Sequence, residues 1–184
     1  MKRIFIAVKV EPGEPLLQMI SSLKTGLRNE NVKWTNPGNI HITLSFPGDT
    51  GEEKIKPVIA MLNERCEGFG KFEFIIKGAG VFKNLSDPRV IWTGIEPSRE
   101  LEHLNEVIVT GLKNIDIGIE NRPFRPHLTL GRIKNLKDKN VLKLLLDEFQ
   151  NSEIQKVPVD EVILYESILL HTGPVYQPLS ISKL

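Results

Sequence analysis

Short runs rich in β-branched and aromatic residues alternate along the chain with longer stretches in which apolar residues recur every three or four positions. The short runs predict seven strands, many with Pro or Gly at an edge, at 3–10, 39–46, 71–82, 89–95, 126–133, 157–170 and 175–181. The longer stretches predict four helices, at 14–29, 52–65, 98–113 and 137–149. Ser98 is a candidate N-cap for the third of them.

The two halves of the chain repeat one another at an offset of about 86 residues. His41 and His127 are 86 positions apart, and so are Arg3 and Arg89, which each open a predicted strand. The offset predicts a duplicated unit within one two-lobed domain over residues 1–184. The expected fold class is α+β, with two pseudo-symmetric lobes, each an antiparallel sheet with outer helices, facing a central cleft.

The tripeptide pattern His-x-Thr (HxT), in which x is any residue, occurs once in each half, at His41–Thr43 and at His127–Thr129. On a strand, alternate side chains point to the same face, so each motif presents its histidine and its threonine together. Continued alternation in the first copy predicts a polar face of His41, Thr43 and Ser45, and an apolar face of Ile42, Leu44 and Phe46.

Paired histidines suit acid–base chemistry at a phosphate group. One neutral imidazole accepts a proton from water while the other, protonated, donates to the leaving oxygen. Thr43 and Thr129 are the expected phosphate-binding groups, because hydroxyls donate hydrogen bonds to non-bridging oxygens. The two histidines have two alternative interpretations. In one, each is a strand residue that only hydrogen-bonds to the backbone; in the other, the pair belongs to a zinc site. The zinc site lacks the three protein ligands usual for catalytic zinc, so we expect no metal and no cofactor.

Charge limits the kind of ligand. The 24 lysines and arginines against 23 acidic residues argue against a protein that wraps a long stretch of nucleic acid. They are compatible with one nucleotide or one RNA end. The windows 31–48 and 121–137, which contain the two motifs, hold no carboxylate, and the second holds Arg122, Arg125, Arg132, Lys134 and Lys137. This distribution favours an anionic ligand at the motifs.

Composition points to a cytoplasmic enzyme. The one cysteine, Cys66, excludes an internal disulfide, and no apolar run is long enough to span a bilayer. The N-terminal stretch 1–9 is expected to be a strand and not a signal peptide. We expect a monomer with no membrane segment.

The motifs and their surroundings resemble the 2H phosphoesterases, and within them the 2'-5' RNA ligase or RNA 2',3'-cyclic phosphodiesterase group. The resemblance covers nearly the whole chain and is carried by Arg3–Ala7, Trp34, Asn39–Gly48, Pro88–Trp92, Phe124–Arg132, Leu164–Ser167 and Gly173–Tyr176. It implies hydrolysis of a terminal 2',3'-cyclic phosphate, on RNA or a small oligonucleotide, to a 2'-phosphate. It also implies that His41 is the proton donor and His127 the proton acceptor, roles that chemistry alone leaves interchangeable.

Two other functions remain open on the same residues: an ATP-independent 2'-5' RNA ligase, and a non-catalytic module that binds RNA ends or nucleotides. Arg132 is a further candidate for binding phosphate or the next nucleotide. Strict strand alternation turns the Arg132 side chain to the other face of the strand from His127, so this role requires a bulge or a strand end. Trp34, Phe124 and Tyr176 are candidates either for stacking on a base or for packing in the core.

Overall fold

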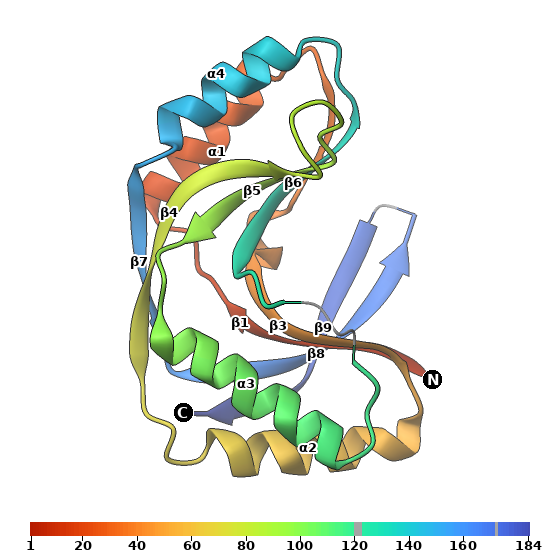
Figure 1. Ribbon diagram of the computed structural model, residues 1–184. Helices are drawn as coiled ribbons and strands as arrows, with labels where there is room; N and C mark the ends of the chain where they lie inside the picture. Colours follow the sequence, from red (N-terminus) through yellow and green to blue (C-terminus); the bar gives the residue numbers. More distant parts are fainter. Residues whose placement is uncertain (120–122, 172) are drawn as a thin grey trace.

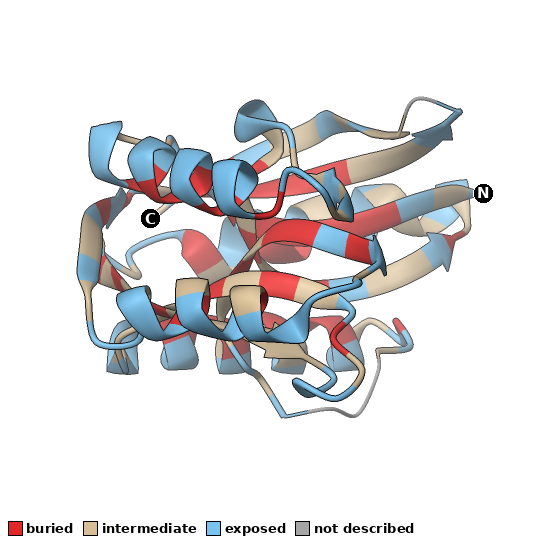
Figure 2. Cartoon of the chain, turned by 90° about the horizontal axis from the view of Figure 1, so that it is seen from above, coloured by how far each residue is buried: buried red, intermediate tan, exposed pale blue. Residues whose placement is uncertain are grey.

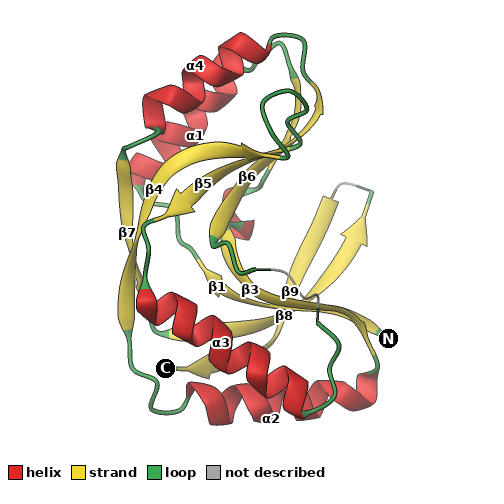
Figure 3. Cartoon of the chain, viewed as in Figure 1, coloured by secondary structure: helices red, strands yellow, loops and turns green. Residues whose placement is uncertain are grey.

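The structure is a computed structural model that describes residues 1–119, 123–171 and 173–184. Within these residues the chain forms four α-helices, one short 3-10 helix and nine strands (Figure 3). In chain order they are β1 (Lys2–Lys9), α1 (Glu14–Gly26), β2 (Asn31–Trp34), η1 (Pro37–Asn39), β3 (His41–Thr50), α2 (Glu52–Cys66), β4 (Phe72–Phe82), β5 (Val90–Ile95), α3 (Arg99–Asn114), β6 (His127–Asn135), α4 (Lys139–Phe149), β7 (Glu153–Val159), β8 (Glu161–Leu170) and β9 (Gly173–Lys183).

The described strands form one antiparallel sheet in the order β7-β4-β5-β6-β3-β1-β8-β9, with β2 paired to β6. At its centre, β3 and β6 meet at one residue pair, Ile42 with Leu128, and then diverge. The α+β class is therefore confirmed, and the two sheets that we expected are two halves of one sheet. Each half forms one lobe of the molecule (Figure 1).

Two helices cover each half of the sheet on its outer side. Helices α1 and α4 pack on the half that contains β4 and β7, whereas α2 and α3 pack on the half that contains β3, β8 and β9 (Figure 1). The helices have buried residues on one side and exposed residues on the other (Figure 2), as expected of amphipathic helices that cover a sheet. In α3, for example, Leu101, Leu104 and Ile108 are fully buried.

The strand order is symmetric about the contact between β3 and β6, because strands related by the repeat lie at equal distances on either side of it. The offset of 86 residues superposes β1 on β5, β3 on β6 and β4 on β8, and these strands occupy mirrored places in the order β4-β5-β6-β3-β1-β8. The same offset relates α1 to α3 and α2 to α4. Helix α1 follows β1 in the chain but packs on the other lobe with α4, and α3 likewise packs with α2. Each lobe is therefore built from both halves of the sequence.

Two elements differ from the sequence prediction. The stretch 157–170 is not one strand, because β7 ends at Val159 and β8 begins at Glu161. Strand β7 pairs with β4 in one lobe and β8 pairs with β1 in the other, so the chain crosses between lobes at Asp160. The sequence does carry a sign of that crossing, because Asp160 and Glu161 are residue types disfavoured in strands, and the prediction ran through them. The four-residue strand β2 was also missed, since it is too short for a clear alternating pattern.

Both HxT strands contain a bulge directly after the motif. The register of β3 against β1 passes from Thr43 to Ser45 and skips Leu44, and the register of β6 against β5 skips Leu130. A bulge reverses the alternation of faces beyond it. Ser45 is consequently buried, at 8% exposure, and Phe46 is 39% exposed. Our placement of Ser45 on the polar face and Phe46 on the apolar face was wrong.

Each bulge leaves a backbone carbonyl outside the ladder, and each carbonyl has a donor. The buried Asn105 side chain of α3 donates from Nδ2 to the Leu44 carbonyl at 2.6 Å. The Leu130 carbonyl accepts from the backbone N–H of Thr35 at 2.9 Å. A buried carbonyl without a partner carries a desolvation cost, so these two bonds maintain the bulged shape of the motif strands.

We predict that Asn105→Ala lowers the free energy of unfolding by about 1–3 kcal/mol, because it leaves the buried Leu44 carbonyl without its donor. Chemical denaturation measures the change. His103→Ala on the same helix is the control, since that side chain is 65% exposed, and its effect should stay within about 0.5 kcal/mol. Equal effects of the two substitutions would contradict the role given to Asn105.

Candidate active site

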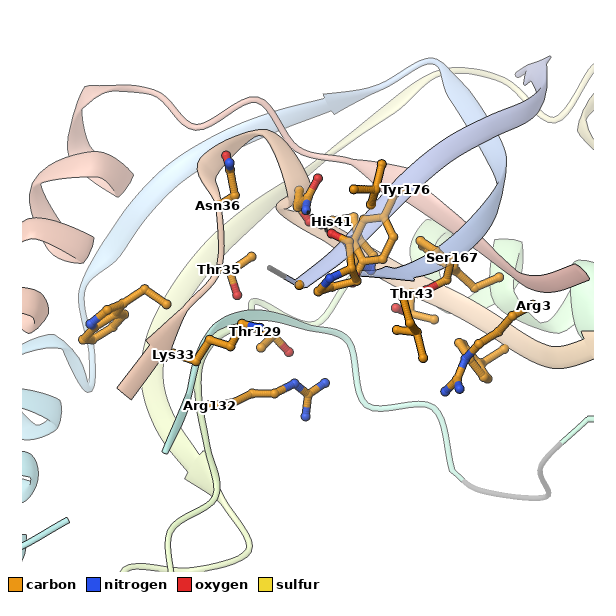
Figure 4. A pocket seen from close by; sticks show the side chains of 18 of the residues that line it. Arg3, Lys33, Thr35, Asn36, His41, Thr43, Thr129, Arg132, Ser167 and Tyr176 are labelled. Atoms are coloured by element: carbon orange, nitrogen blue, oxygen red, sulfur yellow. Dashed lines mark hydrogen bonds between the residues drawn. The ribbon is translucent and has the colours of Figure 1, made fainter. Parts of the chain in front are cut away.

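A cavity of about 810 Å³ lies between the diverging halves of the sheet, and all five residues predicted from the sequence line it: His41, Thr43, His127, Thr129 and Arg132. Figure 4 shows several of these side chains facing one another across the cavity. Arg132 reaches it because the bulge at Leu130 restores that side chain to the face of His127. The bulge required by the sequence argument is therefore present.

The pairing of Ile42 with Leu128 fixes how the four motif side chains are arranged. In an antiparallel register centred on that pair, His41 lies opposite Thr129, and Thr43 lies opposite His127. The two histidines are then diagonal neighbours across β3 and β6. Ile42 and Leu128 are fully buried behind them, and the four polar residues His41, Thr43, His127 and Thr129 (the polar four) face the cleft together.

Each histidine makes the same backbone contact. Nδ1 of His41 lies 2.7 Å from the carbonyl oxygen of Asn39, and Nδ1 of His127 lies 2.7 Å from that of Arg125. A carbonyl only accepts, so each Nδ1 carries the proton and donates. This contact matches the structural alternative considered from sequence, but it uses one nitrogen of each ring. Nε2 of both rings therefore remains for proton exchange in the cleft.

The surroundings of the two imidazoles differ. His41 packs against Phe5, and in a T-shaped arrangement against Tyr176, at centroid distances of 5.0 and 5.2 Å, while His127 makes a T-shaped contact with Phe82 at 4.8 Å. Burial lowers the pKa of His41 below its usual 6.5; the bond to Asn39 works in the opposite direction, and repulsion from a charged His127 lowers it further.

The lowered pKa has a chemical consequence. His41 is therefore neutral near pH 7, and the repulsion opposes double protonation of the pair. A phosphate anion between the two rings favours the charged form and raises the pKa of His41 again. An anion in the cleft thus favours a protonated imidazole at this position.

Among the lining residues that the structure describes there are four cations, Arg3, Lys33, Arg132 and Lys134, and no aspartate or glutamate. Lys33 and Arg3 were not predicted as site residues. The acid-free window 31–48 pointed to the neighbourhood of Lys33, but nothing in the pattern identified β2 as its carrier. Of the basic residues in the second window, Arg122 lies outside the described residues.

The cleft has two chemically different ends. The end next to His41 holds Lys33, Arg132 and Lys134, since Lys33 pairs with Arg132 across β2 and β6. We name these three residues the basic end. The other end holds Arg3, Phe46 and Ser167, which we name the aromatic end. Figure 4 shows Lys33 and Arg132 on one side of the cavity, and Arg3 and Ser167 on the other.

The undecided aromatic candidates have different places. Trp34 and Tyr176 line the cavity, and Trp34 also packs against the hydrophobic core, as Phe124 does. Among the described residues, no group of three His, Cys, Asp or Glu side chains is arranged to hold a metal ion. No helix in the same residues has the length and apolar character needed to cross a membrane.

Comparison with known proteins supports the fold and identifies the family. The family model described as LigT like Phosphoesterase matches residues 6–92 and again 95–176. The chain belongs to this family, one of the 2H phosphoesterases. Among its relatives, the RNA 2',3'-cyclic phosphodiesterase of Methanothermobacter thermautotrophicus is 34% identical over 99% of this chain and 98% of that protein. The protein of the same name from Thermotoga maritima is 35% identical over 96% and 92%, respectively.

Solved structures show the same architecture. A crystal structure of a Thermus thermophilus protein matches with a TM-score of 0.82 and 26% identity, over 99% of this chain and 97% of that one. Escherichia coli LigT, crystallised with 3'-AMP, matches with a TM-score of 0.73 over 100% and 98%. At 22% identity the second likeness concerns the fold alone.

We predict a pH-dependent loss of stability that depends on His41. Because its pKa is lowered in the folded protein, the unfolded chain takes up that proton first, so stability falls as the pH drops through 6.5 toward the lowered value. Chemical denaturation at about pH 7 and about pH 5 should show a smaller loss for His41→Gln than for the wild type. The control His103→Gln should follow the wild type, and an equally large loss in His41→Gln would refute the assignment.

Proposed function

We propose that this protein is an RNA 2',3'-cyclic phosphodiesterase that opens a terminal 2',3'-cyclic phosphate to a 2'-phosphate. The observation that carries the proposal is the diagonal pair of histidines, each with Nδ1 bonded to a backbone carbonyl and Nε2 left for the cleft. The names of the relatives over nearly the full chain length support the same activity.

The proposed reaction needs only groups that the cleft already contains. Hydroxyls of Thr43 and Thr129 hold the non-bridging phosphate oxygens. His127 accepts a proton from water through Nε2, and the water oxygen attacks phosphorus opposite the 3' oxygen. The P–O3' bond breaks, His41 protonates the departing 3' oxygen, and the phosphate stays on the 2' oxygen. The division of roles between His41 and His127 follows the family resemblance.

These roles also orient the RNA. The leaving 3' oxygen belongs to the terminal ribose, so that ribose lies on the side of His41. The upstream chain then leaves through the basic end, where Lys33, Arg132 and Lys134 neutralise its phosphates. A non-catalytic RNA-binding module is the weaker candidate, because binding alone gives no reason for two imidazoles that both keep Nε2 for the cleft.

We also propose that residues 1–184 act as one two-lobed domain of duplicated origin, working as a monomer in the cytoplasm. The mirrored strand order supports the duplication. One chain supplies both motifs and both ends of the cleft, so the site requires no second copy.

Burial raises the pKa of the Cys66 thiol to about 11, which makes it an inert core residue and leaves it without a redox role.

The central test uses an oligoribonucleotide that ends in a 2',3'-cyclic phosphate, incubated with protein in excess chelator. We expect the wild type to produce the 2'-phosphate, and His41→Ala and His127→Ala each to lower kcat by about 10²–10⁴-fold through loss of acid–base assistance. Phosphorus NMR or chromatography identifies the position of the product phosphate. The exposed His103→Ala is the matched control and should retain wild-type turnover.

The results separate the mechanisms. Turnover that vanishes with chelator would indicate metal chemistry, and turnover that survives both histidine substitutions would move the reaction away from this cleft. A 3'-phosphate product would keep the two-histidine mechanism but reverse the orientation of the ribose.

The basic end generates a second prediction, on salt dependence. Lys134→Gln should reduce kcat/KM more for an oligonucleotide than for a mononucleoside 2',3'-cyclic phosphate, which has no upstream phosphate. The plot of log kcat/KM against log salt should become shallower by about 0.7 for the oligonucleotide, the contribution of one phosphate contact on a single strand. Lys113→Gln, an exposed lysine of α3, is the control. Equal losses on both substrates would contradict an upstream path along this end.

A further inference from the structure

The ends of β8 and β9 extend past the rest of the sheet as a two-stranded ribbon (Figure 1). Residues 167–170 of β8 pair with residues 173–176 of β9, whereas the pairing of β8 with β1 reaches only to Glu166. We name these two segments the hairpin arm. Several apolar side chains of the arm are exposed, those of Leu169, Leu170 and Val175. Because a two-stranded hairpin is only marginally stable in water, the place of the arm depends on the contacts that it makes with the cleft.

The arm contacts the first motif strand and the turn before it at two points. The ring of Tyr176 makes a T-shaped contact with the imidazole of His41, at a centroid distance of 5.2 Å (Figure 4). The side chain of Asn39 donates from Nδ2 to the backbone carbonyl of Pro174 at 3.3 Å. Among the described residues, no other side-chain hydrogen bond joins the arm to the rest of the chain. The place of the arm and the place of the His41 ring are therefore linked.

Asn39 holds the arm with its side chain and His41 with its backbone. It is the last residue of η1, where its N–H donates to the carbonyl of Asn36 at 2.8 Å, and its own carbonyl accepts the Nδ1 proton of His41 at 2.7 Å. A shift of the Asn39 peptide group therefore turns the imidazole. The offset of 86 residues relates Asn39 to Arg125, so the second copy has no carboxamide at this position. The link belongs to the first histidine and is not part of the repeat.

We propose that Asn39 is a positioning residue, which couples the hairpin arm to His41 and holds the imidazole in the orientation that proton transfer to the leaving oxygen requires. Asn39 moves no proton itself and acts through the ring of His41. With Nδ1 fixed to the Asn39 carbonyl, the direction of Nε2 follows from the plane of the ring, and a misplacement of about 1 Å is enough to cost about 10²-fold in rate. The inference rests on the proposed phosphodiesterase function and adds to it a residue outside the two motifs.

The same link affects how much water reaches His41. The rings of Phe5 and Tyr176 cover the imidazole, and an arm released from Asn39 takes the Tyr176 ring with it. The charged and titratable groups that surround His41 on the neighbouring strands are Lys9, Lys33, His127, Arg132, Tyr165 and Tyr176. Replacement of the uncharged Asn39 by alanine changes the charge of none of them. A change in the pKa of His41 in that variant therefore reports a change in its exposure to water.

The test is a double-mutant cycle on hydrolysis of an oligoribonucleotide with a 2',3'-cyclic phosphate end. We expect Asn39→Ala to lower kcat by about 10- to 100-fold and to leave KM nearly unchanged, because the imidazole is misplaced while the phosphate-binding groups remain. Asn39 also lines the cavity, so a direct contact with RNA is the competing explanation. The cycle separates the two: added to His41→Ala, the Asn39→Ala substitution should cause no further loss.

A second measurement needs no substrate. In an NMR titration of the histidine side chains, Asn39→Ala should raise the pKa of His41 from its lowered value toward 6.5, because the released arm no longer keeps water from the ring. The resonances of His127 in the same sample are the internal reference and should titrate as in the wild type.

Two further variants control for folding and for the type of substitution. Asn39→Asp keeps the size of the side chain but offers the Pro174 carbonyl no donor at neutral pH, so its kcat should fall as well. Asn114→Ala, an exposed asparagine at the end of α3, should alter neither kcat nor the titration of His41. Chemical denaturation of each variant confirms that the protein measured is folded.

The remaining outcomes overturn the positioning role. Losses that multiply in the double variant, or a rise of KM in place of a fall of kcat, would make Asn39 a substrate-binding residue. Wild-type kcat and an unshifted His41 titration in Asn39→Ala would show that the arm and the imidazole are not coupled. A wild type that does not hydrolyse the cyclic end would remove the proposed function and with it the positioning role in that reaction, whereas an unshifted titration beside active wild type would remove the coupling alone.

Discussion

One backbone pairing, Ile42 with Leu128, determines most of what this molecule can do. Because β3 and β6 meet at that pair and then separate, the sheet opens into two lobes with a cleft between them. The same pair sets the register that brings each motif histidine opposite the threonine of the other motif. The two fully buried side chains anchor this crossing from the core side, so the geometry of the polar four depends on packing behind them.

The pseudo-symmetry of the site is retained where chemistry needs two similar groups and lost where it needs different ones. Both histidines donate from Nδ1 to the carbonyl two residues earlier, at the same distance of 2.7 Å. Beyond them, burial and aromatic contacts act on His41, and the positions after the bulges hold a phenylalanine in one copy and an arginine in the other. Directionality in a duplicated cleft thus comes from its surroundings and not from the motifs themselves.

Local sequence patterns predicted most of the helices, strands and site residues, and long-range strand pairing accounts for the features that they missed. The motif residues, the four helices and most strands follow from hydrophobic periodicity and residue chemistry, which act over a few positions. The bulges at Leu44 and Leu130 depend on what neighbouring strands offer, so the positions of Ser45 and Phe46 could not be read from alternation. Lys33 was missed for a related reason: its side chain reaches the cleft because a short strand, β2, pairs with β6, which lies far along the chain.

The exchange of helices between the lobes has a consequence for how the chain comes to fold. Strand β1 needs β8 as a neighbour, with Ile4 paired to Glu166, and α1 packs against α4 and β7. As the ribosome extends the chain, the first half therefore emerges without the partners that complete either lobe. Such distant pairings slow folding and leave strand edges open until late in synthesis. The lobe that contains β1 and β3 therefore stays incomplete until β8 has been synthesised, although both HxT strands precede β8 in the chain.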